Sequence, residues 1–260
     1  MITIKNLMKK FDDRPVLSDI DLEIKTGEIM VIMGGSGCGK STLLRILVGY
    51  YTPDQGEVLF DGKNIVGMRE SQLDEIRKQF GILFQSGALL NSLTVGENVA
   101  LPLREHSNLN EDIISIIVKI KLELVGLTGF EDLKPSQISG GMKKRVGLAR
   151  AIALDPKIVF YDEPGAGLDP ITAGVIDTLI LDLSKKLGMT SVVVTHEMKS
   201  AFRIADRMAM LYEGKVIEVG TPDEIKNSKN PIVQQFITGG ADGPIPLKRS
   251  SADYLNSLMG

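Results

Sequence analysis

The chain has 260 residues, of which 43% are hydrophobic and 24% charged, and its formal net charge is −3. This length can bury a substantial core, and the composition is ordinary for a globular protein. The weakly acidic balance argues against general nucleic-acid binding, which favours a clearly basic surface, so we expect no nucleic-acid partner. One cysteine, Cys38, excludes an internal disulfide and indicates a reducing compartment.

No stretch of the sequence predicts a passage through a membrane. The N-terminal residues MITIKNLMKKF lack the apolar core of a secretory signal. The most apolar helical segment, residues 113–127, is interrupted by Ser115, Lys119, Lys121 and Glu123. No run reaches the roughly 20 apolar residues that a spanning helix needs. We therefore expect any association with a membrane to go through a partner protein.

Short strands are predicted in the first third of the chain. Apolar and polar residues alternate at 2–4 and 20–24, and residues 28–33 form an apolar run typical of a strand buried on both faces. Residues 56–65 predict another strand with a turn inside it. From about residue 71 to residue 153 the pattern is mostly helical.

Two further buried strands are predicted at Lys157–Pro164 and Ser191–Glu197, with a helix between them at Pro170–Leu187. Strands that alternate with helices indicate βαβ units, so we expect an α/β fold with a largely parallel sheet. Ligands bind such sheets at the carboxyl ends of the strands. The predicted buried strands all end in a phosphate-type loop or in reactive side chains, which predicts a binding site at that edge.

The last part of the chain predicts a hairpin at residues 208–220 and then a helix. Thr221 is its expected N-cap, and Glu224 completes a capping box. After Thr238 the sequence is rich in Gly and Pro. We expect residues 1–240 to form one domain and residues 241–260 a C-terminal tail.

The glycine-rich loop after the first buried strand matches the P-loop pattern G-x-x-x-x-G-K-S, with a strand before it and a helix after it. Its backbone N–H groups would turn toward phosphate oxygens, its lysine would neutralise the β- and γ-phosphates, and its serine would offer a hydroxyl to Mg²⁺. Cys38 fills a variable position, where it either simply fits or, beside a helix N-terminus, carries an acidified thiol. The predicted phosphate-binding residues are Gly34, Gly35, Ser36, Gly37, Cys38, Gly39, Lys40, Ser41 and Thr42.

Acidic residues end the second buried strand and a histidine ends the third. Asp162 suits the second Mg²⁺ ligand, and Glu163 is placed to polarise an attacking water, a role that contributes ~10²–10⁴-fold to a rate. The alternative is a polar strand end that leads into a turn at Pro164. His196 would contact the γ-phosphate, unless it is a structural histidine. His106 is expected to be an exposed loop residue.

The segment QISGGMKKR (137–145) predicts a helix that begins after Ser139 and offers free backbone N–H groups to an anion. Lys143, Lys144 and Arg145 crowd the first turns, where the helix dipole disfavours cations. An anion bound at Ser139 and the two glycines after it would offset that repulsion. The alternative is a plain serine cap followed by a solvated basic face.

Six motifs occur in the order found in ABC-transporter ATPases, which the chain resembles from about residue 2 to residue 220. They are the P-loop, FQ at 84–85, SGGM at 139–142, VFYDEP at 159–164, GLDP at 167–170 and TH at 195–196. The resemblance implies a P-loop NTPase of ABC type: a largely parallel core sheet, an antiparallel β-subdomain, and a helical subdomain at about residues 86–153. It also implies ATP and Mg²⁺ as cofactors.

The resemblance implies a head-to-tail dimer of two copies, in which the SGGM segment of each copy caps the ATP on the other copy's P-loop. Phe11 is then the aromatic that stacks on adenine, and Asp169 reaches across the dimer. Met142 replaces the family's usual glutamine, so a side-chain hydrogen bond is lost there while the backbone anion site remains. The implied catalytic residues are Lys40, Gln85, Glu163 and His196; the metal ligands are Ser41, Gln85 and Asp162; and Ser139, Gly140, Gly141 and Met142 contact nucleotide.

The segment from Phe80 to His106 favours one branch of the family. In ABC ATPases this region docks the coupling helix of a multi-pass permease, and apolar residues here either serve that contact or belong to the core: Leu89, Leu90, Leu93 and Val95. The sequence of this segment, together with SGGM and the DGPIP tail, resembles that of the Mla phospholipid-transport branch, whose permeases work with MCE-domain lipid-binding proteins. This implies a peripheral position at the cytoplasmic face of a bacterial inner membrane, with a tail that either packs on the neighbouring ATPase or stays free.

Three other function classes compete with this interpretation. An ABC importer of a small polar solute would share every motif. A soluble ABC ATPase acting on ribosomes or DNA would contain two cassettes or long coiled coils, and no sustained heptad pattern occurs between Gln85 and Ser139. A stand-alone P-loop kinase would leave SGGM and His196 without a role. The motifs do not encode the direction of transport.

Overall fold

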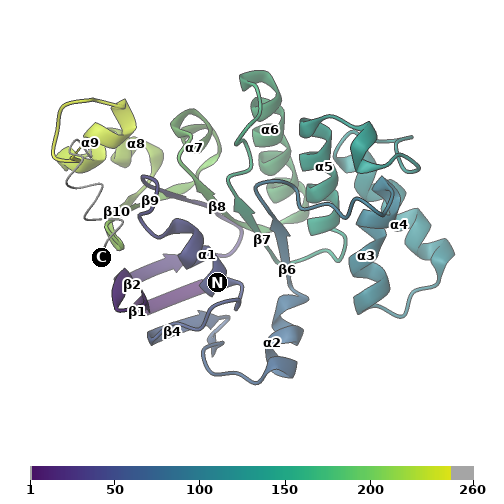
Figure 1. Ribbon diagram of the computed structural model, residues 1–260, viewed down its shortest axis with the longest axis horizontal. Coiled ribbons are helices and arrows are strands. Elements are labelled where there is room, and N and C mark those ends of the chain that lie inside the picture. The colour runs from purple at the N-terminus through teal and green to yellow at the C-terminus, as the bar shows by residue number, and fades with distance from the viewer. Residues whose placement is uncertain (1, 247–260) are drawn as a thin grey trace.

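The computed structural model describes residues 2–246 of the chain (Figure 1). Its strands are β1 (Ile2–Phe11), β2 (Arg14–Ile24), β3 (Ile29–Met33), β4 (Gln55–Phe60), β5 (Lys63–Asn64), β6 (Phe80–Leu83), β7 (Ile158–Asp162), β8 (Thr190–Thr195), β9 (Arg207–Tyr212) and β10 (Lys215–Gly220). Its helices are α1 (Lys40–Leu47), α2 (Glu70–Arg77), α3 (Val95–His106), α4 (Glu111–Leu124), α5 (Gly140–Ala151), α6 (Pro170–Leu187), α7 (Met198–Ile204), α8 (Pro222–Lys226) and α9 (Pro231–Thr238). A 3₁₀ turn, Pro135–Gln137, precedes α5.

A six-stranded sheet in the order β10-β9-β3-β8-β7-β6 forms the centre of the molecule. Its pairs are parallel except for β9 with β10, which form the predicted hairpin. Every residue of β3 and β8 is buried, as expected for strands covered on both faces. The predicted α/β fold with a largely parallel sheet is therefore confirmed.

A second, antiparallel sheet has the order β2-β1-β4-β5. One apolar core includes Ile4 and Leu22 from this sheet, Leu43 from α1, and Ile32 and Phe160 from the central sheet. Helix α1, which begins inside the P-loop, is thus packed between the two sheets. Burying each such side chain contributes roughly 1.5–3 kcal/mol, so this packing fixes the loop at the start of α1.

The other face of the central sheet carries helices α3 to α6. Its core joins Val193 of β8 and Ile180 of α6 to Val99, Leu122 and Leu148 from α3, α4 and α5. Figure 1 shows α3, α4 and α5 grouped at one end of the molecule. The limits predicted for a helical subdomain, about 86 and 153, remain a prediction.

The mostly helical pattern predicted for residues 71–153 misses one strand. Residues 80–83 form β6, the edge strand of the central sheet, which pairs in parallel with β7 through Phe80 and Ile158. Gly81 is required there, because a Cβ at this position would lie 2.3 Å from the backbone oxygen of Ala151 at the end of α5. Four residues are too few for a period-2 pattern to stand out beside neighbouring helices.

Two expectations concern the ends of the chain and the membrane. No helix within residues 2–246 is long and apolar enough to cross a bilayer. The predicted tail begins at residue 241. A hydrogen bond of 2.6 Å from the N–H of Ile245 to Oε1 of Gln235 joins its first residues to α9. Residues 247–260, which make up most of that tail, lie outside the described residues.

Candidate functional site

Strand register brings the three predicted strand ends to one edge of the central sheet. Met33 of β3 pairs with Thr195 of β8, and Asp162 of β7 pairs with Val194. The P-loop, Glu163 and His196 each follow directly on these strands. The convergence expected from the sequence is therefore present in the structure.

The P-loop fills the gap between β3 and α1 with a backbone that only glycine can adopt at two points. Gly34 has φ 154° and Gly39 has φ 108°. A Cβ would lie 2.2 Å from the oxygen of Leu211 at the first position and 2.9 Å from the oxygen of Val16 at the second. Helix α1 has no side-chain cap at its N-terminus, so its first N–H groups remain available to an anion.

Lys40 is buried and folds back onto this loop. Its Nζ donates to the oxygens of Gly34 at 2.7 Å and Gly35 at 2.9 Å, and lies 3.9 Å from Cys38 Sγ. Burial raises the pKa of the Cys38 thiol, and the charge of Lys40 opposes this only in part. The direction of this pKa shift contradicts the alternative of an acidified thiol at Cys38, because desolvation outweighs the charge and the hydrogen bonds of Lys40.

Glu163 occupies a strained turn, with φ 49°. Its N–H donates to the oxygen of Val194 at 2.9 Å, which holds the turn against β8. One carboxylate oxygen accepts from Thr195 Oγ1 at 3.2 Å and from the N–H of His196 at 3.4 Å. The other lies 2.9 Å from Nδ1 of His196, whose ring is exposed. This geometry places a fixed carboxylate and a histidine together, and it favours a functional His196 over a structural one.

Asp162 and Ser41 supply the donor types that Mg²⁺ uses. Burial raises the pKa of Asp162, the charge of Glu163 raises it further, and Arg45, Lys40 and Lys144 act in the opposite direction. The described residues contain no cluster of three or more His, Cys, Asp or Glu side chains that could hold a metal alone. Mg²⁺ commonly binds through one or two carboxylates together with substrate phosphates, so one carboxylate and one hydroxyl beside a P-loop fit this ion.

Ser139 caps α5 by accepting from the N–H of Met142 at 3.3 Å. Ser139 and Gly140 are exposed, whereas Gly141 is buried against α6, where a Cβ would lie 2.4 Å from Thr172 Cγ2. The serine cap therefore satisfies one of the N–H groups at the start of this helix.

Two of the three basic residues in the first turns of α5, Lys144 and Arg145, differ from both expectations. Lys144 is buried and donates to the backbone oxygens of Glu163 at 3.1 Å and Pro164 at 2.9 Å. Arg145 donates to the oxygens of Val125 at 3.2 Å and Gly126 at 3.0 Å. These carbonyls offset the two positive charges, so they neither require an external anion nor form a solvated basic face. That argument for an anion at Ser139 therefore loses two of its three cations, and the anion contact itself remains a prediction.

The remaining predicted contacts lie at the margins of this edge. Phe11 ends β1 and is 38% exposed, with its ring edge-on to Tyr51 at 5.3 Å between centroids. Gln85 is exposed just after β6. Asp169 caps α6 by accepting hydrogen bonds from the N–H groups of Ile171 and Thr172 at 3.0 Å each. The hydroxyl of Thr172 also donates to its carboxylate, and this bond first, followed by the backbone bonds, lowers the pKa of Asp169.

Sequence reasoning missed three residues of the site. Thr195 orients the Glu163 carboxylate, Lys144 holds its backbone, and Arg45 lends positive charge to Asp162. Thr195 stood in a quoted motif without an assigned role. Lys144 and Arg45 act across long sequence separations, and no local pattern signals such contacts.

The segment after β6 is partly exposed and partly core. Leu90 is 46% exposed, whereas Val95 is fully buried and Leu89 and Leu93 are intermediate. A hollow of about 460 Å³ lies between β6, α3 and α5, and half-exposed Phe84 lines it. His106, also on its rim, is exposed as expected, although it ends α3 and does not lie in a loop.

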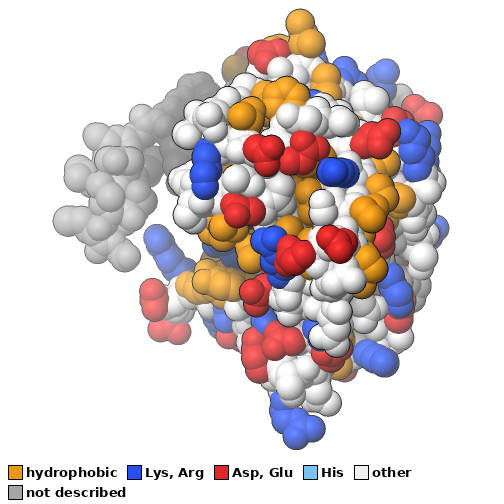
Figure 2. Space-filling view, turned by 90° about the vertical axis from the view of Figure 1, so that its right-hand side faces the viewer, with side chains coloured by type: hydrophobic (Ala, Val, Ile, Leu, Met, Phe, Trp, Pro, Cys, Tyr) orange, Lys and Arg blue, Asp and Glu red, His pale blue; other side chains and the backbone are white. Residues whose placement is uncertain are grey.

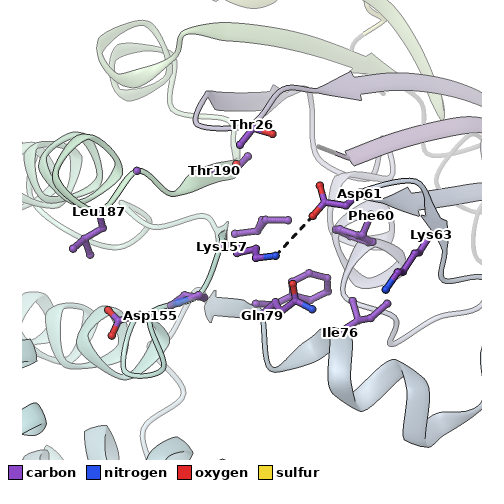
Figure 3. A pocket seen from close by; sticks show the side chains of 14 residues that line it. Thr26, Phe60, Asp61, Lys63, Ile76, Gln79, Asp155, Lys157, Leu187 and Thr190 are labelled. Atoms are coloured by element: carbon purple, nitrogen blue, oxygen red, sulfur yellow. Dashed lines mark ion pairs between the residues drawn. The ribbon is translucent and has the colours of Figure 1, made fainter.

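Another pocket lies at the opposite end of the central sheet (Figure 3). It is lined by residues at the starts of β6, β7 and β8 and by parts of the antiparallel sheet, including Phe60, Lys157 and Thr190. Lys157 Nζ lies 4.0 Å from Asp61 Oδ2 across it. Since catalytic groups of parallel sheets gather at the carboxyl ends of the strands, we assign this pocket no part in the chemistry.

Comparisons with known proteins agree with this geometry. The sequence profile of the ABC transporter family matches residues 17–166. The chain is 46% identical over 259 residues to the intermembrane phospholipid transport system ATP-binding protein MlaF of Haemophilus influenzae, which covers 100% of this chain and 98% of that protein. It is 43% identical over 244 residues to the probable ribonucleotide transport ATP-binding protein mkl of Mycobacterium leprae, covering 94% and 70% of the two chains.

A solved structure supports the fold. The dimeric, post-hydrolysis ATP-binding cassette MJ0796, bound to ADP and Pi, superposes with a TM-score of 0.79 at 34% identity, covering 85% of this chain and 99% of that one. The profile match, the full-length likeness and the shared fold lead to one conclusion. This chain is an ATP-binding cassette protein and belongs to the ABC transporter family.

Proposed function

We propose that this chain is the ATP-hydrolysing subunit of a transporter that moves phospholipid between the inner and outer membranes of a bacterial envelope. The observation that carries the substrate class is the 46% identity to a phospholipid-transport ATPase across the entire chain. The cassette profile ends at residue 166, but the likeness continues through α6 to α9 and the tail. It therefore extends well beyond the motifs that all cassettes share.

The proposed chemistry is hydrolysis of the γ-phosphate of ATP. Free N–H groups of the P-loop and α1 bind the phosphates, and Lys40 moves from the loop carbonyls to the phosphate oxygens. Ser41 and Asp162, with help from Gln85, would hold Mg²⁺, which would neutralise part of the phosphate charge. Glu163 accepts a proton from the attacking water in the transition state, while His196 fixes the carboxylate and reaches toward the γ-phosphate.

The active unit is a head-to-tail dimer, with Ser139, Gly140, Gly141 and Met142 of one copy closing on the ATP of the other. Beside the Asp169 cap, Ile171 is 82% exposed and Val175, one turn later, is 44% exposed. Apolar side chains this exposed beside the predicted dimer contact at Asp169 suit burial by a second copy. Full burial would contribute roughly 1.5–3 kcal/mol for a fully exposed side chain, so Ile171 would contribute most of that and Val175 about half, and both favour association.

A permease is the proposed membrane partner. Phe84, which precedes Gln85 in the chain, presents an apolar ring in the hollow between β6, α3 and α5. A coupling helix seated in it would contact Phe84, and Gln85 is the next residue along the chain. Figure 2, which views the side of α3 and α4, shows several separate groups of hydrophobic side chains among charged ones. We propose a peripheral position at the cytoplasmic face of the inner membrane, with an MCE-domain protein in the same complex.

The test of this function is purification and reconstitution. The tagged chain, isolated in detergent, should retain a multi-pass permease and an MCE-domain protein, and the complex should contain phospholipid. Reconstituted in vesicles, it should transfer labelled phospholipid only with hydrolysable ATP. A complex that carries no lipid and moves none would refute the substrate class while leaving the ATPase intact.

A second substrate class has one observation in its favour. The relative from Mycobacterium leprae, 43% identical, is named for probable ribonucleotide transport. An importer of small polar solutes would leave nucleotides or other polar solutes in the permease cavity and stimulate its ATPase with them. Extraction of the purified complex followed by mass spectrometry separates this alternative from lipid transport.

A further inference from the structure

Three lysines are buried among the described residues: Lys40, Lys121 and Lys144. Lys40 serves the P-loop, and Lys121 forms an ion pair with Asp155 at 2.5 Å. The ammonium group of Lys144 instead donates hydrogen bonds to the backbone oxygens of Glu163 and Pro164. A buried ammonium with neutral partners is a costly choice, because desolvation disfavours the charged form. Burial indeed lowers the pKa of Lys144, while the charges of Glu163 and Asp162 act in the opposite direction.

The two carbonyls that Lys144 binds belong to the turn that aims the Glu163 carboxylate. The backbone of Glu163 has φ 49°, a conformation that persists only when surrounding contacts determine it. One side of the turn is held by the bond from Glu163 N–H to Val194, and another by the bond from Ala166 N–H to the oxygen of Glu163. Lys144 holds the side facing α5, and it binds both peptides that follow the carboxylate.

We propose that Lys144 is a positioning residue for hydrolysis, which fixes the turn of Glu163 from the helix that begins at Ser139. This inference rests on the proposed function, in which Glu163 polarises the water. Helix α5 starts at Gly140, one residue after Ser139, and Lys144 lies about 6 Å further along its axis at ~1.5 Å per residue. A nucleotide of the partner copy that docks on the start of α5 is thereby connected to the catalytic carboxylate of this copy.

The first experiment removes the donors of Lys144 stepwise. Lys144→Met keeps the length and removes all donors, Lys144→Gln keeps two, and Lys144→Arg keeps the charge. We expect kcat for ATP to fall about tenfold to a hundredfold in the methionine variant, less in the glutamine variant and least in the arginine variant. KM and ATP affinity should stay within about threefold of the unmodified protein. Lys121→Met is the matched control, a buried lysine without contact to the turn, and its kcat should stay within about twofold.

The second experiment follows the turn directly by hydrogen exchange in the Glu163→Gln background. ATP-driven dimer formation should slow amide exchange in residues 163–168 of this variant. Adding Lys144→Met should remove that slowing although the dimer still forms. If the role of the lysine were purely structural, Lys144→Met would lower the melting temperature. Dimer formation and the slowing of exchange in residues 163–168 would then be kept together or lost together.

Clear outcomes overturn the proposal. They are a Lys144→Met variant that turns over ATP within about twofold of the unmodified protein, equal losses of kcat in the Lys144 and Lys121 variants, or unchanged slowing of exchange in the double variant. The proposed function fails separately, since it requires Glu163→Gln itself to lose activity. An inactive Glu163→Gln beside a fully active Lys144→Met refutes only the role of Lys144.

Discussion

Replacing Glu163 with glutamine separates chemistry from binding in this site. The amide has the shape of the carboxylate, and its oxygen can still accept from Thr195 Oγ1, now at 3.2 Å. Its NH₂ group then faces Nδ1 of His196. This nitrogen must accept a hydrogen bond from the amide, whereas beside a carboxylate oxygen it donates one. Rearranging one or two hydrogen bonds changes the free energy of unfolding by only about 0.5–1.5 kcal/mol. Loss of the base removes ~10²–10⁴-fold from kcat, or roughly 2.7–5.4 kcal/mol of transition-state stabilisation.

The variant should therefore bind ATP, form a dimer with it and hydrolyse it poorly. Phosphate release gives kcat, and sedimentation with and without ATP gives the state of association. Glu197→Gln is the matched control, because Glu197 flanks His196 on its other side, with Oε1 3.9 Å from Nε2, and is exposed. It should keep nearly full activity. Turnover by Glu163→Gln within tenfold of the unmodified protein would show that the base lies elsewhere.

Three further changes test other parts of the account. Ser139→Arg should stop hydrolysis while monomer ATP affinity, measured by titration calorimetry, stays unchanged; residual full activity would contradict the role of α5. Phe11→Ala should weaken ATP binding about fivefold to a hundredfold, from ~1–3 kcal/mol of base stacking, and an unchanged affinity would exclude the stack. Burial raises the folded-state pKa of Asp177 above its ordinary 3.8, against smaller effects of Ser200 and Arg203. At pH values between 3.8 and the higher folded-state pKa, the folded chain binds more protons at Asp177 than the unfolded chain does. The stabilisation that Asp177 contributes therefore falls as the pH rises through this range. Asp177→Asn should remove that slope from the melting temperature, and an identical slope would refute the assignment.

Contiguous patterns made much of the fold predictable from sequence. The buried runs of β3, β7 and β8 are uninterrupted, and the P-loop pattern lies between a strand and a helix, so their meeting at one edge followed from parallel topology. Strand β6 escaped notice because it has four residues, contains Gly81, and finds its partner β7 some 75 residues later.

The site was predictable in its motifs and not in its supporting contacts. Glu163 and His196 were expected at one edge, but their direct contact at 2.9 Å was not. The side chains of Lys144 and Arg145 looked like an unsatisfied basic cluster because helix geometry alone cannot show that carbonyls lie beside them. The sequence alone could not decide whether the pKa of Cys38 is lowered, because the burial that raises it depends on tertiary packing between the two sheets.

Specific ATPase activity measured across a dilution series, with the fraction of dimer determined at each point, tests the central claim. If each catalytic centre needs the start of α5 from a second copy, activity per subunit should rise in proportion to the dimer and vanish toward the monomer. A demonstrably monomeric sample with full activity per subunit would contradict a shared active site.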